Sequence, residues 1–157
     1  MTDYKTRRKI MVDTQIRPSD VTKFPIIDAF LSVPREKFVP DGNREAAYIG
    51  ENFLIGQNRV ILEPRTLAKL LDALNINNDE LVLDIGTGLG YSSAVISLLA
   101  EVVIAVEDDS SLASESEEIL SEIGADNVVV QVSKLEDGAP EHGPYDVIIL
   151  QGGVEEI

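Results

Sequence analysis

Short apolar runs alternate with helix-length segments along the second half of the chain. The apolar runs are Leu81–Ile85, Val102–Val106, Val128–Val132 and Tyr145–Leu150. Nearly continuous runs of this length are typical of strands that are buried on both faces of a sheet. The segments Tyr91–Leu99 and Ser111–Ile123 lie between them and have the length of helices. The pattern predicts an α/β fold with a mostly parallel sheet and helices on both faces, joined by right-handed crossovers.

The first half of the chain is less regular. We expect helices over Thr2–Ile16 and Pro25–Val33, and a third from Pro64 to about Leu74, where leucines recur at helical spacing. Residues 41–63 scatter glycines among isolated apolar residues, which predicts a loop with short strands. We therefore expect one structural domain, in which a helical and loop extension (residues 1–62) packs on a core (residues 63–157).

Composition places the chain among globular proteins and restricts its chemistry. Of 157 residues, 44% are hydrophobic and 26% are charged, which is ordinary for one folded domain. The chain has no cysteine, so disulfides, thiolate metal ligands and cysteine nucleophiles are excluded. It shows neither a secretory signal nor a long apolar span, so we expect a cytoplasmic protein without a membrane partner.

The formal net charge of −15 is unevenly distributed. Residues 1–40 carry eight Lys or Arg and five acids, so the rest of the chain is strongly acidic. An acidic body repels phosphate backbones, and Arg7, Arg8 and Lys9 alone form a thin basic cluster. We expect no nucleic-acid partner.

A glycine-rich turn follows the first apolar run. Gly86, Gly88 and Gly90 alternate with other residues where the strand is expected to pass into a helix. Glycine allows the backbone to turn tightly and to approach a ligand closely. The spacing differs from the G-x-G-x-x-G pattern of dinucleotide sites, and the lysine of a P-loop is missing. We therefore expect a nucleoside without phosphates rather than a pyrophosphate.

An acid ends the next apolar run. Glu107 lies 21 residues beyond Gly86, and the carboxyl ends of neighbouring parallel strands line one crevice. A carboxylate at that point can accept both hydroxyls of a ribose. The alternative is an empty Rossmann-like scaffold in which Glu107, Asp108 and Asp109 begin a loop and place negative charge at a helix N-terminus.

Several phrases together resemble the protein-L-isoaspartate (D-aspartate) O-methyltransferases. They are Met11–Arg17, Val33–Pro40, Ala47–Tyr48, Leu83–Tyr91 and Pro140–Asp146. The phrase at 33–40, Val-Pro-Arg-Glu-Lys-Phe-Val-Pro, is the most specific, because generic methyltransferases share the glycine turn but lack it.

The resemblance implies a Rossmann-like S-adenosylmethionine-dependent methyltransferase fold. It implies S-adenosyl-L-methionine as cofactor and an isoaspartyl-containing peptide or protein as substrate, whose abnormal carboxylate is methylated in a repair cycle. It also implies a set of cofactor-binding residues. These are Asp84, Gly86, Thr87, Gly88, Gly90, Tyr91, Glu107, Asp108, Lys134 and Leu135.

This chemistry needs no general base. The sulfonium of the cofactor is already an electrophile, and an isoaspartyl carboxylate is already ionised at neutral pH. Positioning and exclusion of water can carry the rate, so we assign no catalytic residue. Scattered acids without His or Cys clusters are weak ligands, and we expect no metal. The single histidine, His142, is expected in a surface turn.

Three segments depart from the family pattern. Val60 and Leu62 stand where the family has Thr and Ser, whose hydroxyls belong to its active site. Ser133–Leu135 replaces Gly-Asp-Gly, and its lysine has no acceptor for the adenine amino group. Leu150–Gly153 stands where Thr-Ala-Ala is usual. Arg59 is either a compensating positive charge or an exposed loop arginine. A second hypothesis follows: a non-catalytic relative that binds S-adenosylmethionine, S-adenosylhomocysteine or a protein partner.

The sequence stops after the fourth main strand, which is earlier than in the fold that it resembles. The usual strand order is 3-2-1-4, and it would leave Tyr145–Leu150 as an exposed apolar edge that invites pairing with another chain. Two alternatives remain open: a fragment of a longer gene product, and a molecule that completes itself by self-association.

Overall fold

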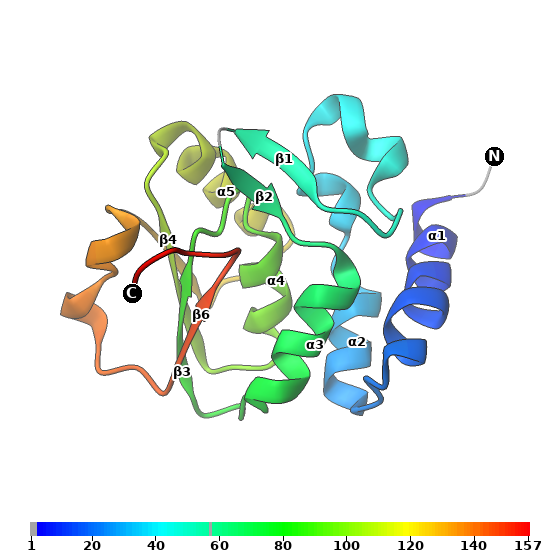
Figure 1. The fold of residues 1–157 in the computed structure, drawn as a ribbon, viewed down its shortest axis with the longest axis horizontal. Helices are drawn as coiled ribbons and strands as arrows, with labels where there is room; N and C mark the ends of the chain where they lie inside the picture. The colour runs from blue at the N-terminus through cyan, green and yellow to red at the C-terminus, as the bar shows by residue number, and fades with distance from the viewer. Residues whose placement is uncertain (1–2, 57) are drawn as a thin grey trace.

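The computed structural model describes residues 3–56 and 58–157. Its centre is a four-stranded parallel sheet in the order β5-β4-β3-β6, which confirms the predicted order (Figure 1). The strands are β3 (Leu81–Ile85), β4 (Val102–Glu107), β5 (Val128–Val132) and β6 (Val147–Leu150). The register is continuous, with Asp84 opposite Ala105 on one side and opposite Ile149 on the other.

The helices follow the predicted segments closely. They are α1 (Tyr4–Met11), α2 (Phe24–Ser32), α3 (Pro64–Leu74), α4 (Tyr91–Ser97) and α5 (Ser110–Glu122). A π-helical turn over Val12–Ile16 continues α1, so the first predicted helix is confirmed from Tyr4, and residue 2 lies outside the described residues.

One predicted strand begins too early. The strand β6 starts at Val147, whereas the apolar run predicted a start at Tyr145. The hydroxyl of Tyr145 donates to the carbonyl of Ala139, which holds this residue on the preceding crossover. The register with β3 begins at Val147, opposite Val82. Just before it, the Asp146 carboxylate accepts from the Leu81 amide at 2.9 Å.

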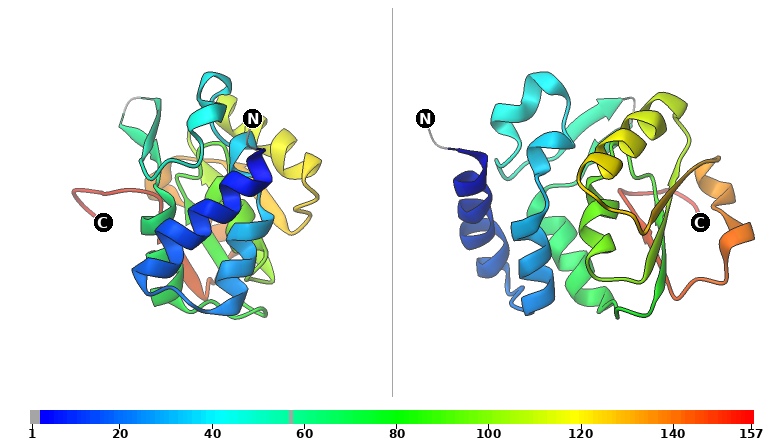
Figure 2. Two further views of the ribbon diagram at one scale, coloured as in Figure 1. Left: turned by 90° about the vertical axis from the view of Figure 1, so that its right-hand side faces the viewer. Right: turned by 180° about the vertical axis from the view of Figure 1, so that it is seen from behind.

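The two faces of the sheet are covered differently. The helices α4 and α5 pack on one face together with the N-terminal helices, whereas the crossover 133–146, with 3-10 turns at 135–137 and 140–142, covers part of the other (Figures 1 and 2). Burial on both faces holds for β3 and β4. It is wrong for the outer strands, since Val132 and Ile148 are each 57% exposed, and an outer strand has a neighbour on one side only.

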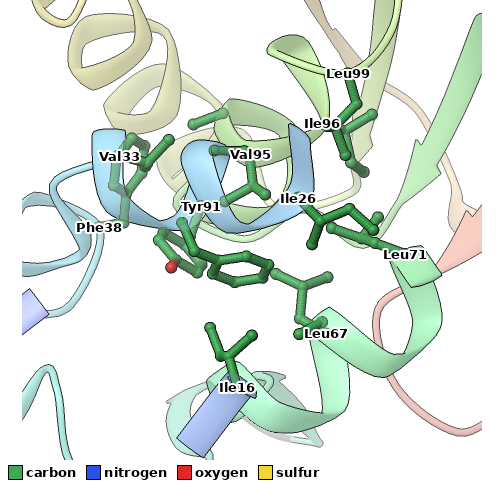
Figure 3. Close-up of a cluster of buried hydrophobic side chains, with 14 of the residues drawn as sticks. Ile16, Ile26, Val33, Phe38, Leu67, Leu71, Tyr91, Val95, Ile96 and Leu99 are labelled. Atoms are coloured by element: carbon green, nitrogen blue, oxygen red, sulfur yellow. The ribbon is translucent and has the colours of Figure 1, made fainter. Parts of the chain in front are cut away.

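One hydrophobic cluster joins the N-terminal segment to the core. Tyr91, at the start of α4, lies among side chains from the N-terminal helices and α3, including Ile16, Phe38 and Leu67 (Figure 3). Its ring meets Phe38 edge-on, with the ring centres 5.8 Å apart. The guanidinium of Arg35 lies 4.6 Å from the Tyr91 ring centre, within the range of a cation–π contact. This packing fixes the beginning of α4, and hence the turn before it.

A small antiparallel hairpin lies between the N-terminal segment and the sheet. Its strands are β1 (Phe53–Gly56) and β2 (Arg59–Ile61), which confirms short strands within the predicted loop. No helix in the described part of the chain is long and apolar enough to cross a membrane.

Candidate functional site

The three glycines of the turn after β3 all adopt positive φ angles. Gly86, Gly88 and Gly90 have φ of +80°, +58° and +96°, a region that side chains rarely enter. The amide of Gly86 donates to the Val106 carbonyl at 2.9 Å, which ties the turn to the end of β4. A Cβ on Gly88 would lie 2.5 Å from Cδ1 of Ile55 in the hairpin. The turn therefore needs glycine both for its path and for its close contacts.

Glu107 lies beside this turn, as the parallel topology predicts. Its carboxylate is fully buried and accepts from the Gly88 amide at 2.7 Å. The amides of Asp108 and Asp109 donate to its other oxygen at 3.1 and 3.2 Å. The structure thus brings the glycine turn and the acid at the end of β4 into direct contact.

Arg59 of the hairpin binds the same carboxylate. Its Nη1 lies 2.8 Å from Oε1 of Glu107 and its Nη2 lies 2.5 Å from Oε2, a two-pronged ion pair. Nη1 also lies 2.8 Å from Oδ1 of Asp108. The Arg59 side chain is only 17% exposed, and its hydrogen bond with Glu107 raises the pKa of the guanidinium. The reading of Arg59 as an exposed loop arginine is wrong, because the hairpin folds back over the glycine turn.

Asp84 is buried below the turn and is surrounded by neutral donors. Its Oδ2 accepts from the hydroxyls of Ser92 and Ser93 at 2.6 and 2.7 Å, and Oδ1 accepts from Nε2 of Gln151 at 2.8 Å. Burial raises the pKa of Asp84, and these three donors oppose that rise. Sequence reasoning missed all three donors. The sequence could have predicted two of them, because a buried carboxylate requires hydrogen-bond donors and Ser92 and Ser93 follow within the next helix.

A cleft of about 480 Å³ opens next to the turn. Gly86 and Arg59 line one part of it, and Leu135, Leu150 and Gln151 line another. Among the predicted cofactor residues, Gly86 and Leu135 therefore face this cleft. Lys134 is exposed and is not among the described residues that line it.

Of the remaining predicted residues, Asp108 is half exposed, whereas Thr87 and Tyr91 lie deeper. A cavity of about 10 Å³ lies between the hairpin and the start of α4, and Val60 and Leu62 line it together with Thr87 and Tyr91. Both Thr87 and Tyr91 are buried, and their hydroxyls have no hydrogen-bond partner among the described residues. Val60 and Leu62 are apolar, and they stand at the positions where the resemblance implies Thr and Ser. The hydroxyls of Thr87 and Tyr91 therefore face apolar side chains across this cavity.

Comparison with known proteins decides which family this arrangement represents. The model of the protein-L-isoaspartate (D-aspartate) O-methyltransferase family matches residues 6–157. The chain belongs to this family. A protein-L-isoaspartate O-methyltransferase of Syntrophus aciditrophicus (strain SB) is 35% identical over 157 residues, all of this chain and 72% of the relative. A second relative, from Anaeromyxobacter sp. (strain Fw109-5), is 35% identical over 98% of this chain and 63% of its own length.

Solved structures of protein-L-isoaspartate O-methyltransferases agree on the fold. One has a TM-score of 0.80 at 25% identity, over 98% of this chain and 49% of that chain. Another, from Plasmodium falciparum, was solved in complex with S-adenosyl-L-homocysteine, and has a TM-score of 0.78 at 19% identity over all of this chain and 77% of its own. The present chain therefore spans between half and three quarters of these proteins.

Proposed function

We propose that this chain binds S-adenosyl-L-methionine beside Gly86, Gly88 and Glu107 and takes part in methyl transfer to the carboxylate of isoaspartyl residues. The observation that carries the proposal is the 2.7 Å contact between the Gly88 amide and the buried Glu107 carboxylate. The contact supports the proposal because a carboxylate able to accept hydroxyls lies directly beside backbone that has no side chain. Family membership agrees with this assignment.

The residues present fit such a cofactor. The cleft of about 480 Å³ lies within the range of small-molecule sites, roughly 300–1,000 Å³. Glu107 would hold the ribose hydroxyls, and Leu135 would pack on the adenine. Asp84 acts on the loop rather than from the cleft, since its oxygens bind Ser92, Ser93 and Gln151. When bound, the cofactor supplies an activated methyl group, so the protein has only to orient the acceptor and exclude water.

The acceptor in this proposal is an isoaspartyl-containing peptide or protein. Its carboxylate is ionised at neutral pH and needs no base, which agrees with a site built from glycines, acids and apolar residues. We place the reaction in the cytoplasm as part of this proposal. We also propose that the edge of β6 allows association with a second copy, because β6 pairs with β3 alone in the described sheet.

A second candidate function is a non-catalytic relative that binds the same nucleoside or a protein partner. Val60 and Leu62 favour it, since the hairpin places apolar side chains against Thr87 and Tyr91. Neither side chain can donate a hydrogen bond to an acceptor carboxylate. Loss of a donor at a reacting centre costs roughly a hundredfold or more in rate.

Two measurements separate these functions. Transfer of a labelled methyl group to an isoaspartyl peptide is compared with transfer to the matched aspartyl peptide, and the affinity for S-adenosylhomocysteine is measured by calorimetry. Labelling of the isoaspartyl peptide alone supports the enzyme. Binding without transfer supports the non-catalytic relative. Absence of binding, with folded protein, removes the nucleoside from both candidates.

A further inference from the structure

The Glu107 carboxylate already has a full set of partners inside the protein. Its two oxygens accept five hydrogen bonds, from the amides of Gly88, Asp108 and Asp109 and from both terminal nitrogens of Arg59. A carboxylate offers about four lone-pair positions. The present hydrogen bonds already fill these positions, so the two hydroxyls of a ribose can enter only if two of the present bonds are given up.

Arg59 is the donor that can leave. The three amides belong to the glycine turn and to the backbone after β4, and moving them would break the turn itself. Arg59 reaches Glu107 by its side chain, from a hairpin 48 residues away in the sequence. Its guanidinium also covers the turn, since a Cβ on Gly86 would lie 3.5 Å from its Nη2.

We propose that Arg59 is an internal competitor for the ribose site and lowers the affinity of this chain for S-adenosyl nucleosides. This role rests on the proposed function, and it makes Arg59 the residue that controls how often the proposed nucleoside site is occupied. The guanidinium binds Glu107. A ribose that enters displaces it and takes both carboxylate oxygens.

The surroundings of Arg59 provide a second position for the displaced charge. Nη1 already lies 2.8 Å from Asp108, whose side chain is 49% exposed, and the guanidinium can keep this partner while it leaves Glu107. The released cation is then paired with the half-exposed Asp108 and is not buried alone, which would be costly. Arg59 thus has two carboxylates within reach, of which only Glu107 is needed for ribose.

Competition of this kind has a defined effect on binding. The apparent dissociation constant equals the intrinsic constant divided by the fraction of molecules in which Glu107 is available. The ion pair is two-pronged and mostly shielded from water, so that fraction is small. Removing the guanidinium makes every molecule available, and affinity increases without any new contact to the nucleoside.

The test is calorimetric titration of the whole chain with S-adenosylhomocysteine. We expect Arg59→Gln to bind about tenfold more tightly than the wild type, which corresponds to about 1.4 kcal/mol. Arg59→Met keeps the apolar stem over the turn and is expected to show the same gain. Arg44→Gln is the matched control, because Arg44 pairs with Asp41 at 3.2 Å in an exposed position outside the site, and its affinity should equal that of the wild type.

A second readout does not depend on ligand. Without nucleoside, Arg59→Gln leaves the buried Glu107 without its cation, so the melting temperature falls; at saturating nucleoside most of this difference disappears. Equal or weaker binding by both Arg59 variants overturns the inference and leaves the proposed function intact. Absence of binding by the wild type and by every folded variant overturns the proposed function together with the inference.

Discussion

At the residue scale, the two buried acids of the site are satisfied in different ways. Asp84 is surrounded by uncharged donors from Ser92, Ser93 and Gln151, whereas Glu107 accepts from a guanidinium and three amides. Neutral donors offset only part of the cost of burying a charge, and burial raises the pKa of Asp84. Asp84 therefore anchors α4 and the residue that follows β6, whereas Glu107 joins the glycine turn to Arg59 of the hairpin.

The raised pKa of Asp84 makes stability depend on pH. The folded state holds the proton at higher pH than the unfolded state, whose pKa is near 3.8. The stabilisation is complete below that value and is lost as pH rises through the folded pKa. We expect Asp84→Asn to remove this part of the pH dependence, measured as unfolding free energy in urea between about pH 4 and about pH 7.

The control for this measurement is Asp79→Asn, the same change at an exposed position before β3. This variant keeps Asp84 and should therefore keep the part of the pH dependence that comes from Asp84. If Asp84→Asn falls as steeply with pH as the wild type does, the carboxylate titrates alike in the folded and unfolded states, and the argument from burial is wrong.

Gly88 is the residue at which the turn tolerates least change. Alanine would need φ near +58° and would place its Cβ 2.5 Å from Cδ1 of Ile55. We expect Gly88→Ala to lower the unfolding free energy by roughly 1–3 kcal/mol, because the hairpin has to shift. Binding of S-adenosylhomocysteine should weaken as well, measured by calorimetry on folded protein.

Gly42→Ala is the matched control for Gly88→Ala. A Cβ at Gly42 meets no atom within 4 Å, so the unfolding free energy should change by less than about 0.5 kcal/mol. Equal stability and affinity of Gly88→Ala and Gly42→Ala would contradict the close contact between the hairpin and the turn.

At the element scale, apolar runs predicted the sheet well and the hairpin poorly. Leu81–Ile85 and Val128–Val132 are strands with the predicted bounds, because a continuous apolar run identifies a strand without reference to distant residues. The contact of Arg59 with Glu107 could not be predicted in this way. It joins positions 48 residues apart, and periodicity contains no information about which loop covers which turn.

Because of the hairpin, we expect mutations to change methyl transfer and nucleoside affinity separately. Val60 and Leu62 line the small cavity beside Thr87 and Tyr91, whereas Arg59 of the same hairpin binds Glu107. The double change Val60→Thr with Leu62→Ser introduces hydroxyls on the acceptor side. We expect the rate of methyl transfer to an isoaspartyl peptide to rise by roughly tenfold to a hundredfold, because one hydrogen-bond donor at the reacting centre changes the rate by about that factor.

Affinity for S-adenosylhomocysteine provides the internal comparison for the double variant. It should stay within about twofold of the wild type, because neither residue contacts Glu107, and a twofold change is only about 0.4 kcal/mol. Binding at unchanged affinity with no transfer by either the wild type or the double variant would show that more than these two hydroxyls is missing, and would favour the non-catalytic relative.

At the scale of the whole molecule, the sheet ends in two different edges. On one side β5 carries Val129 and Val132, 43% and 57% exposed, and on the other β6 carries Ile148, also 57% exposed. The β5 edge has polar contacts nearby, since Gln131 hydrogen bonds to His142 of the crossover at 2.9 Å. His142 therefore lies in an exposed turn, as predicted from the sequence, and its side chain is not part of the hydrophobic core.

The β6 edge is the surface from which we expect self-association. In the described sheet β6 pairs only with β3, so the outward amides and carbonyls of Val147–Leu150 have no strand partner there. An apolar edge without a strand partner is a template for pairing with a second chain. We expect a concentration-dependent dimer in light scattering, lost in Ile148→Lys and retained in Val132→Lys, the same change on the opposite edge. A wild type that stays monomeric at all concentrations, or a dimer that survives Ile148→Lys, would rule out this edge, because a lysine on an edge strand disfavours pairing with another strand.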